Sequence, residues 1–234
     1  MAQLPLKLLL VEGQDELRVI PQLIEKATEL RWGESRDRKP RLVEIKVAGS
    51  VSTLLSSKQR NEEGLLEPGY IETELKTANL HSLGVLLDAD LDVRARWQAL
   101  RDRCLERYPD FPKEPLPQGL VLTPALGPRL GAWLMPNNLE PGMLETFLLT
   151  LCPQSYSPDL WQYAQDAVAH VEKRTNGQPP WKPTHRDKAL VHTFLAWQDP
   201  PGRQMHEAVM ENLLDVKGPA AKSFVDWFRR LYEV

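Results

Sequence analysis

The most informative stretch of the chain is Gly84-Val85-Leu86-Leu87-Asp88-Ala89-Asp90-Leu91-Asp92. Its first four residues are small or apolar and predict a buried strand, and acidic residues follow at alternating positions. Carboxylates this close together repel one another, and burying them is costly unless a cation neutralises them. A divalent ion such as Mg²⁺ is the natural partner because it prefers oxygen ligands. The alternative is a strand that runs into a solvated acidic turn, with Asp92 capping the next helix.

A second junction between a strand and an acid lies at Leu6-Lys7-Leu8-Leu9-Leu10-Val11-Glu12-Gly13-Gln14-Asp15. The apolar run ends on Glu12, a glycine permits a tight turn, and Asp15 can cap a helix extending to about Arg31. Ligands of parallel α/β sheets bind at the carboxyl ends of the strands, where side chains converge. If the two strands are neighbours, Glu12 and the acids of residues 88–92 face one cleft.

Composition places the chain among ordinary soluble proteins. Its 234 residues can bury a large core, and hydrophobic and charged contents of 42% and 26% are typical of globular domains. The apolar start is too short for a signal peptide or membrane span, so no membrane association is expected. Cys104 and Cys152 show no metal-binding spacing, which favours a reducing, cytoplasmic setting. The formal net charge of −3 argues against a purely electrostatic nucleic-acid binder but is compatible with a nuclease.

The order of patterns along the chain predicts an α/β fold with a mostly parallel sheet flanked by helices. Further strands are expected at 42–47, 120–122 and 130–135, and helices at 71–79, 92–108 and 143–151. Beyond Pro153 the pattern changes to helices separated by breakers, at 158–173, 184–197, 204–214 and 219–232. We therefore predict an α/β domain over residues 1–152 and a helical extension over residues 153–234 that packs on it.

Common nucleotide-binding and hydrolase motifs are absent from the sequence. It contains no GxGxxG turn, no GxxxxGK[ST] loop and no GxSxG elbow. The carboxylate cluster remains, and it suits metal-assisted phosphoryl chemistry. Two ions about 4 Å apart can stabilise both the attacking and the leaving oxygens of a phosphodiester.

Val11-Glu12-Gly13-Gln14-Asp15, followed by Asp88-Ala89-Asp90, resembles the signature of the Toprim superfamily. This superfamily includes topoisomerases, bacterial primases, recombination proteins and overcoming-lysogenization-defect (OLD) nucleases. The resemblance covers residues 4 to 150 and implies a Toprim-like, Rossmann-like fold. By position, Glu12 matches the Toprim glutamate, which acts in acid/base chemistry or metal binding. Asp88 and Asp90 match the aspartates that hold Mg²⁺, for which Mn²⁺ can substitute.

Later segments resemble a group of uncharacterised bacterial Toprim-like proteins related to the OLD nucleases. These segments are Trp133-Leu134-Met135-Pro136-Asn137-Asn138, Gly142-Met143-Leu144-Glu145, residues 187–203 and Phe224-Val225-Asp226-Trp227-Phe228. OLD-type sites add an acidic residue and a lysine to the Toprim set. The resemblance therefore implies Glu145 as a further metal ligand and Lys188 as the lysine.

The leading hypothesis is a Mg²⁺-dependent Toprim-type phosphodiesterase, a nuclease acting on DNA in anti-phage defence or DNA repair. The resemblance implies that Asp88, Asp90 and Glu145 hold metal. Glu12 would bind metal or relay a proton, and Lys188 would stabilise charge on the phosphate. The alternative is a non-catalytic, metal-dependent module that binds nucleic acid or protein and works with a separate ATPase partner. A third hypothesis, a phosphatase-like enzyme acting on nucleotides, predicts a closed pocket.

Each candidate also has an ordinary structural explanation. Glu12 could begin a helix and be stabilised there by the helix dipole. Asp92 is better interpreted as the N-cap of the following helix than as a ligand. Lys188 could be a solvated helix residue, and Lys217 and Lys222 are rival lysines.

Other chemically versatile side chains favour structural roles. His185 and His192 lie on one helical face but have no further marked ligand, so we interpret them as structural. Most of the seven tryptophans are expected in the core rather than stacked on bases. A basic set could contact a phosphate backbone or form a solvated surface: Arg36, Arg38, Lys39, Arg41, Lys58 and Arg60.

Overall fold

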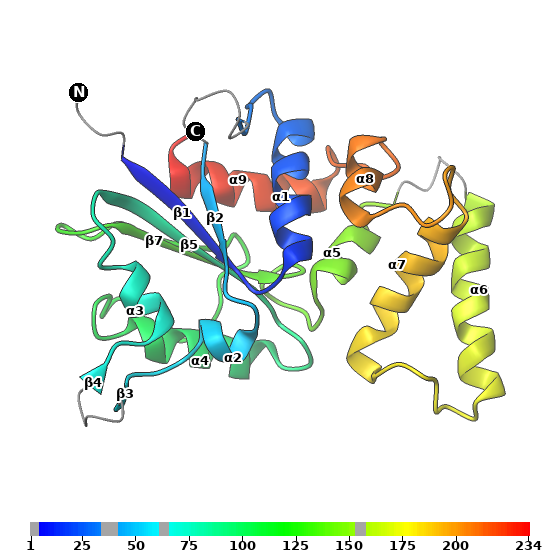
Figure 1. Ribbon diagram of the computed structural model, residues 1–234, viewed down its shortest axis with the longest axis horizontal. Helices are drawn as coiled ribbons and strands as arrows, with labels where there is room; N and C mark the ends of the chain where they lie inside the picture. The colour runs from blue at the N-terminus through cyan, green and yellow to red at the C-terminus, as the bar shows by residue number, and fades with distance from the viewer. Residues whose placement is uncertain (1–4, 34–41, 61–65, 153–157) are drawn as a thin grey trace.

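The computed structural model describes residues 5–33, 42–60, 66–152 and 158–234, and it is built around a five-stranded sheet of order β2-β1-β5-β7-β6 (Figure 1). The strands are β1 (Leu6–Val11), β2 (Glu44–Val47), β5 (Leu80–Asp88), β6 (Leu120–Leu122) and β7 (Arg129–Met135). Neighbouring strands run parallel except β6, which is antiparallel to β7. The prediction of a mostly parallel sheet flanked by helices is therefore confirmed.

Helices cover both faces of this sheet (Figure 1). One face carries α1 (Gln14–Ala27), α5 (Leu144–Thr150) and α9 (Pro219–Tyr232), and α8 (Met205–Met210) packs against α1. The other face carries α2 (Val51–Leu54), α3 (Tyr70–Glu74) and α4 (Val93–Cys104). A helical pair, α6 (Pro158–Arg174) and α7 (Arg186–Ala196), lies beside α5, and α7 follows a 3₁₀ turn at Pro183–His185. A small hairpin is formed by β3 (Gln59–Arg60) and β4 (Leu66–Glu67).

Strand β1 is buried on both faces, as expected for a central strand of a parallel sheet. Leu9 and Val11 pack into the cluster that contains α1 and α9. Leu8 and Leu10 alternate with them and pack into the cluster on the opposite face. A continuous apolar run is therefore needed here, and this explains why the strand could be recognised from sequence.

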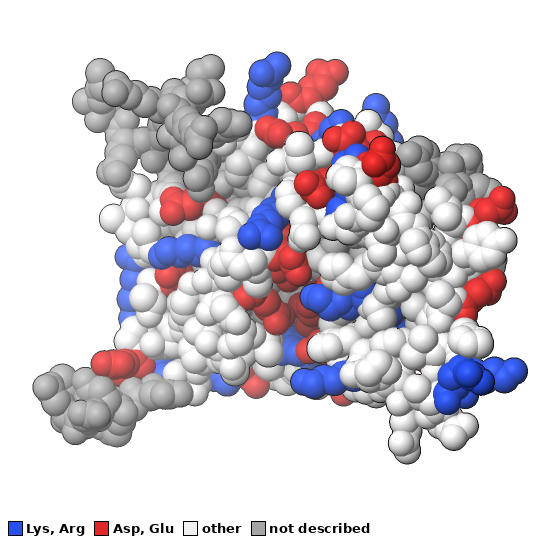
Figure 2. Space-filling view, turned by 45° about the vertical axis from the view of Figure 1, so that its right-hand side comes forward, with Lys and Arg blue, Asp and Glu red and all other residues white. Residues whose placement is uncertain are grey.

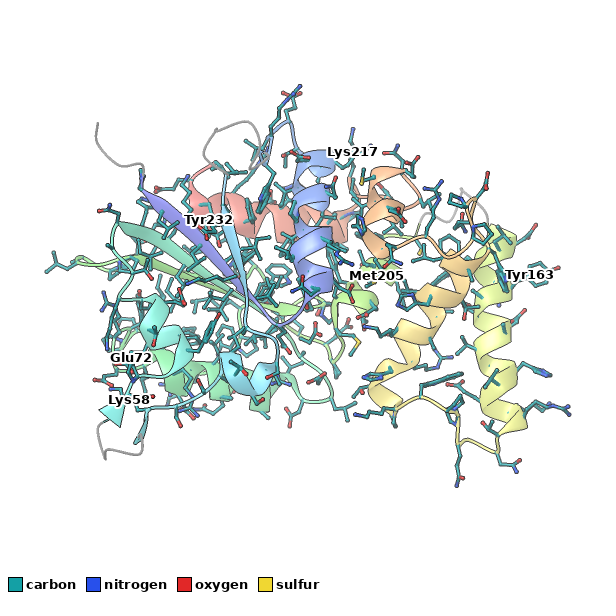
Figure 3. All side chains as sticks on the ribbon, in the orientation of Figure 1. Lys58, Glu72, Tyr163, Met205, Lys217 and Tyr232 are labelled. Carbon is teal, nitrogen blue, oxygen red and sulfur yellow. The ribbon has the colours of Figure 1, made fainter. Side chains whose placement is uncertain are left out.

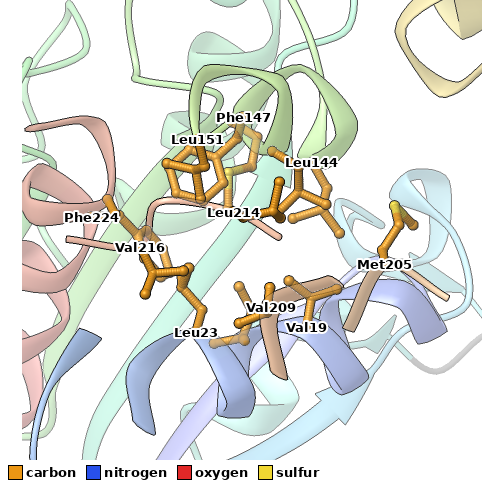
Figure 4. Close-up of a cluster of buried hydrophobic side chains, with 14 of the residues drawn as sticks. Val19, Leu23, Leu144, Phe147, Leu151, Met205, Val209, Leu214, Val216 and Phe224 are labelled. Atoms are coloured by element: carbon orange, nitrogen blue, oxygen red, sulfur yellow. The ribbon is translucent and has the colours of Figure 1, made fainter. Parts of the chain in front are cut away.

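One hydrophobic cluster joins the start of the chain to its C-terminal helices (Figure 4). Val19 and Leu23 of α1 lie near Phe147 of α5, Val209 of α8 and Phe224 of α9. The cluster thus contains residues from both sides of the boundary predicted near residue 152. The division into two domains stays a prediction, but the helical part contributes directly to the core.

Helix α9 packs closely on the sheet because two glycines lie side by side on adjacent strands there. Gly84 of β5 and Gly131 of β7 are aligned in register. An added Cβ at Gly131 would overlap the side chain of Leu231, and one at Gly84 would overlap the hydroxyl of Tyr232. That hydroxyl is buried and donates a hydrogen bond of 2.8 Å to the carbonyl oxygen of Leu8.

The first helix differs from its prediction at both ends. Its N-cap is Gly13, so Asp15 lies in the first turn and is not the cap. It ends at Ala27 rather than near Arg31, because the amide and hydroxyl of Thr28 both donate to the carbonyl of Ile24 and close the last turn. The side chain of Asp92, by contrast, accepts a 2.9 Å hydrogen bond from the amide of Ala95, which confirms the predicted N-cap.

The other helices begin and end within a few residues of the predicted positions, with two exceptions. The segment 204–214 contains only the short helix α8, which ends at Met210. The segment 71–79 likewise contains a single short helix, α3. None of the described helices is long and apolar enough to cross a membrane. Cys104 and Cys152 are both free thiols.

Gly131→Ala is expected to lower the free energy of unfolding by about 1 to 3 kcal/mol, because the added methyl group overlaps Leu231. In a Leu231→Ala background, Gly131→Ala should change the free energy of unfolding little, because the smaller side chain leaves space for the added methyl group. Urea unfolding of the two single variants and the double variant measures this coupling. Equal costs of Gly131→Ala in both backgrounds would refute the direct packing of α9 on the sheet.

Candidate functional site

An acidic cleft of about 300 Å³ lies at the carboxyl ends of β1 and β5. Figure 2 shows acidic side chains gathered in a hollow near the middle of the visible face, with basic side chains at its edge. Lys188 and His185 line the cleft together with a set of acidic residues. These are Glu12, Asp15, Glu16, Asp88, Asp90 and Glu145.

Parallel pairing of β1 and β5 brings the first two acids together. Leu10 is paired with Val85, so Glu12 and Asp88 follow at the same edge of the sheet. The amide of Asp88 donates a 3.0 Å hydrogen bond to Oε1 of Glu12. Oδ1 of Asp88 in turn accepts a 2.9 Å hydrogen bond from the amide of Leu144, the first residue of α5. The condition that the two strands are neighbours is therefore fulfilled.

The backbone holds Asp90 in an uncommon conformation at the cleft wall. Its φ of 53° lies in the left-handed region, which non-glycine residues seldom adopt. Two backbone hydrogen bonds with Gly142, of 2.9 and 2.8 Å, fix this turn. The carboxylate of Asp90 forms an ion pair with the guanidinium of Arg96 on α4. Asp92 is exposed, caps α4 and does not line the cleft.

Lys188 enters the cleft from α7 and binds two of its acids. Nζ lies 2.8 Å from Oε1 of Glu145 and 3.5 Å from Oδ2 of Asp15. The hydroxyl of Thr146 also donates a 2.6 Å hydrogen bond to Asp187, which ties α5 to α7 beside this contact. The structure thus brings Lys188 to the acids of the first 152 residues, although it is distant from them in sequence.

Burial raises the pKa of several carboxyl groups in the cleft. Burial raises the pKa of Glu12 from 4.5 to about 7, against the opposing effect of the hydrogen bond from Asp88. Burial, reinforced by the nearby negative charges of Glu16, Glu12 and Glu145, raises the pKa of Asp88 well above its usual value. Burial likewise raises the pKa of Glu16. Burial opposes the charge of Lys188, but the hydrogen bond and attraction of Glu145 outweigh it and raise the pKa.

The carboxylates of the cleft are ligands that a hard cation prefers. In the structure, however, several of them form ion pairs with basic side chains. Within the described ranges, no three His, Cys, Asp or Glu residues form a group that could hold a metal ion as they stand. Asp90 already forms an ion pair with Arg96, and Glu145 forms one with Lys188. The second carboxylate oxygens of Glu12 and Asp88 accept no hydrogen bond from the described part of the chain. The assignment of metal ligands therefore stays a prediction.

Two residues of the site were not among the sequence-based candidates. Glu16 is only 7% exposed and accepts a 3.1 Å hydrogen bond from the amide of Gly13. Its position in the first turn of a helix that begins just after Glu12 could have placed it near that residue. Arg96 has no such signal, because only the fold brings its helix against the turn at Asp90.

The rival basic residues lie elsewhere. Lys222 pairs with Asp226, and Lys217 lies near α8 (Figure 3); neither lines the cleft. Lys58 forms ion pairs with Glu72 and Glu106 beside α3 and α4 (Figure 3). Arg36, Arg38, Lys39 and Arg41 fall outside the described residues, as does the side chain of Arg60.

The prediction that most tryptophans lie in the core is confirmed, and the structural role of His185 and His192 stays a prediction. Trp133 and Trp227 are buried core residues, as predicted, whereas Trp197 is 43% exposed. His185 lines the cleft and is thus better placed for a role there than the sequence indicated.

Comparison with known proteins gives one match. A family model described as "Protein of unknown function (DUF3226)" matches residues 6–233. No curated protein and no solved structure matches the chain.

Glu12→Gln is expected to stabilise the metal-free protein at pH 8 by on the order of 2 kcal/mol and to have no effect at pH 4. The pKa of Glu12 is about 7 in the folded protein and 4.5 ordinarily, so the folded state binds the proton more tightly. The contribution of Glu12 to stability is therefore fully present below pH 4.5 and is lost as the pH rises through 7. Urea unfolding between pH 4 and 8 measures the difference. Glu29→Gln, at an exposed position after α1, is the control, and an identical pH profile for the two variants would contradict the burial of Glu12.

Lys188→Ala is expected to destabilise the protein by about 1 to 3 kcal/mol, because Glu145 is 3% exposed and would lose its cation. In a Glu145→Gln background the same substitution should cost much less, since no buried charge is left unpaired. Thermal and urea unfolding of the single and double variants measure the coupling. Lys222→Ala, which removes an exposed ion pair, should change stability by no more than about 0.5 kcal/mol. If Lys188→Ala lowers stability equally with and without Glu145→Gln, the ion pair of Lys188 with Glu145 is not the cause of the loss.

Proposed function

Since the chain belongs to the DUF3226 family, whose description leaves its function open, we propose a function from the geometry of the cleft. The protein is a phosphodiesterase that uses Mg²⁺ or Mn²⁺ and cleaves DNA. One observation carries the proposal: Glu12 and Asp88 stand at the ends of adjacent parallel strands, joined by a 3.0 Å hydrogen bond, with a lysine in the same cleft.

The donor set supports the use of a divalent cation. Its acidic side chains offer only oxygen ligands, which Mg²⁺ and Mn²⁺ prefer. Glu12, Asp88, Asp90 and Glu145 would hold the ion. When bound, the ion supplies Lewis-acid activation of water and of the phosphate. Burial, and after it the negative charges of the neighbouring acids, raise the pKa of Asp88, and a divalent cation would compensate the charge of the buried carboxylate.

Two side chains have the properties that the remaining chemistry needs. In the metal-free cleft burial raises the pKa of Glu12 to about 7, so a Glu12 that does not itself bind the ion can accept a proton from the attacking water near neutral pH and release it afterwards. Lys188 stays cationic, because its contacts with Glu145 raise its pKa, and it can neutralise charge that develops on a phosphate oxygen. Proton transfer and charge stabilisation therefore fall to different residues.

Resemblance to the Toprim signature supports the same proposal. Glu12 matches the Toprim glutamate, and Asp88 and Asp90 match its aspartate pair. We propose that the sheet is a Toprim-like domain and that Glu145 and Lys188 complete an OLD-type site. The hollow in Figure 2 is open at the surface, which favours a polymer such as DNA over the closed pocket expected for a nucleotide phosphatase. A cytoplasmic role in anti-phage defence or DNA repair is part of this proposal.

A second function is favoured by the ion pairs that occupy the cleft. Because Arg96 neutralises Asp90 and Lys188 neutralises Glu145, the cleft has internal counter-ions of its own. A non-catalytic module that binds nucleic acid or protein, together with a separate ATPase, would need no turnover at this site. Catalysis by the purified chain alone distinguishes the two proposals.

Supercoiled plasmid incubated with the protein and Mg²⁺ or Mn²⁺ is expected to be nicked or linearised. Asp88→Asn and Glu12→Gln should each lower the rate at least about 100-fold, because a ligand or the proton acceptor is lost. Gel electrophoresis over time measures the rates. Asp110→Asn, at an exposed position after α4, is the matched control and should keep full activity. Cleavage that survives both cleft substitutions would rule out this site, and a wild-type protein without cleavage would favour the binding module.

A further inference from the structure

Asp90 already has a cationic partner in the described structure. The guanidinium of Arg96 contacts its Oδ2 directly, from one turn inside α4. The Arg96 side chain is 16% exposed, whereas that of Asp90 is 37% exposed and lines the cleft. The pair thus stands at the cleft wall, with the carboxylate open to the cleft and the guanidinium behind it.

The two partners differ in how far they can move. The backbone of Asp90 is held in the left-handed region by its hydrogen bonds with Gly142, and its short side chain can move the carboxylate only a small distance from that backbone. Non-glycine residues in such conformations persist where the surroundings fix them, and they concentrate at functional sites. Arg96 has a long side chain with several rotatable bonds on a regular helix, so its guanidinium can reach a second partner. An exchange of partners at this carboxylate therefore needs a movement of the arginine.

From this asymmetry we infer that Arg96 is a positioning residue that exchanges between Asp90 and the substrate. It holds Asp90 until a divalent cation binds the carboxylate, and it then turns to a phosphate oxygen of the substrate. The inference rests on the proposed function, because it takes Asp90 as part of the cation site.

The chemistry of the guanidinium makes phosphate its natural second partner. A guanidinium is a permanent cation, so Arg96 keeps its positive charge after it leaves Asp90. It needs another anion, and its planar fork of donors matches the oxygens of a phosphate. Binding of the cation would thereby make a phosphate-binding group available beside the same acids.

Arg96→Ala should therefore change the affinities for Mn²⁺ and for DNA in opposite directions. Without its competitor, the cleft should bind Mn²⁺ more tightly, by roughly threefold to tenfold. Without its phosphate contact, the protein should bind DNA more weakly and show a raised KM for cleavage. A residue that does not compete with the cation for Asp90 would not strengthen Mn²⁺ binding when removed.

Arg94 provides a matched control on the same helix. Its side chain is 83% exposed and pairs with Glu114, so it does not contact Asp90. Arg94→Ala removes the same charge, and any general electrostatic gain in cation binding will appear there too.

The decisive experiment is calorimetric titration of Mn²⁺, without DNA, into the full-length wild type and the Arg96→Ala, Arg96→Lys and Arg94→Ala variants. Circular dichroism shows whether each variant is folded. If Arg96→Ala is unfolded, the comparison uses Arg96→Lys in its place. Tighter binding for Arg96→Ala, a smaller gain for Arg96→Lys and less than about a twofold change for Arg94→Ala would support the exchange. Unchanged or weaker binding for the Arg96 variants, with normal wild-type binding, would overturn the role of Arg96 alone. Absence of Mn²⁺ binding in every protein would overturn the proposed function and this inference together.

Discussion

The parallel pairing of β1 with β5 is the constraint on which the site depends. It places Glu12 and Asp88 at the same edge of the sheet, where the amide of one donates a 3.0 Å hydrogen bond to the carboxylate of the other. Both strands are buried, so their register is fixed by apolar packing rather than by the charged ends. The energy of the core therefore holds together carboxylates that would otherwise repel one another.

The C-terminal helices complete both the core and the site. Helix α9 packs on β5 and β7 through the facing glycines, and α7 delivers Lys188 to Glu145 at 2.8 Å. The positive charges of Lys188 and Arg96 offset part of the negative charge that the strands collect. The cleft consequently combines acids with paired basic side chains, and the proposed exchange of Arg96 between Asp90 and a phosphate builds on this combination.

Sequence patterns predicted the parts that depend on local chemistry. The apolar runs before Glu12 and Asp88 identified the central strands, and the N-cap at Asp92 was correct. The end of α1, which the two hydrogen bonds from Thr28 to Ile24 determine, was missed. So was the ion pair of Arg96 with Asp90, because it joins α4 to a turn whose left-handed conformation only the folded chain defines. The contact of Lys188 with the cleft was implied by resemblance alone and depends on long-range packing.

We propose that the acids at the ends of β1 and β5 form a divalent-cation site. A crystal structure of the protein soaked in Mn²⁺, with diffraction recorded near the manganese absorption edge, tests this proposal most directly. We expect anomalous density between the carboxylates of Glu12 and Asp88. Anomalous density that is absent from this cleft at saturating Mn²⁺, with the ion pairs of Asp90 and Glu145 intact, would contradict it.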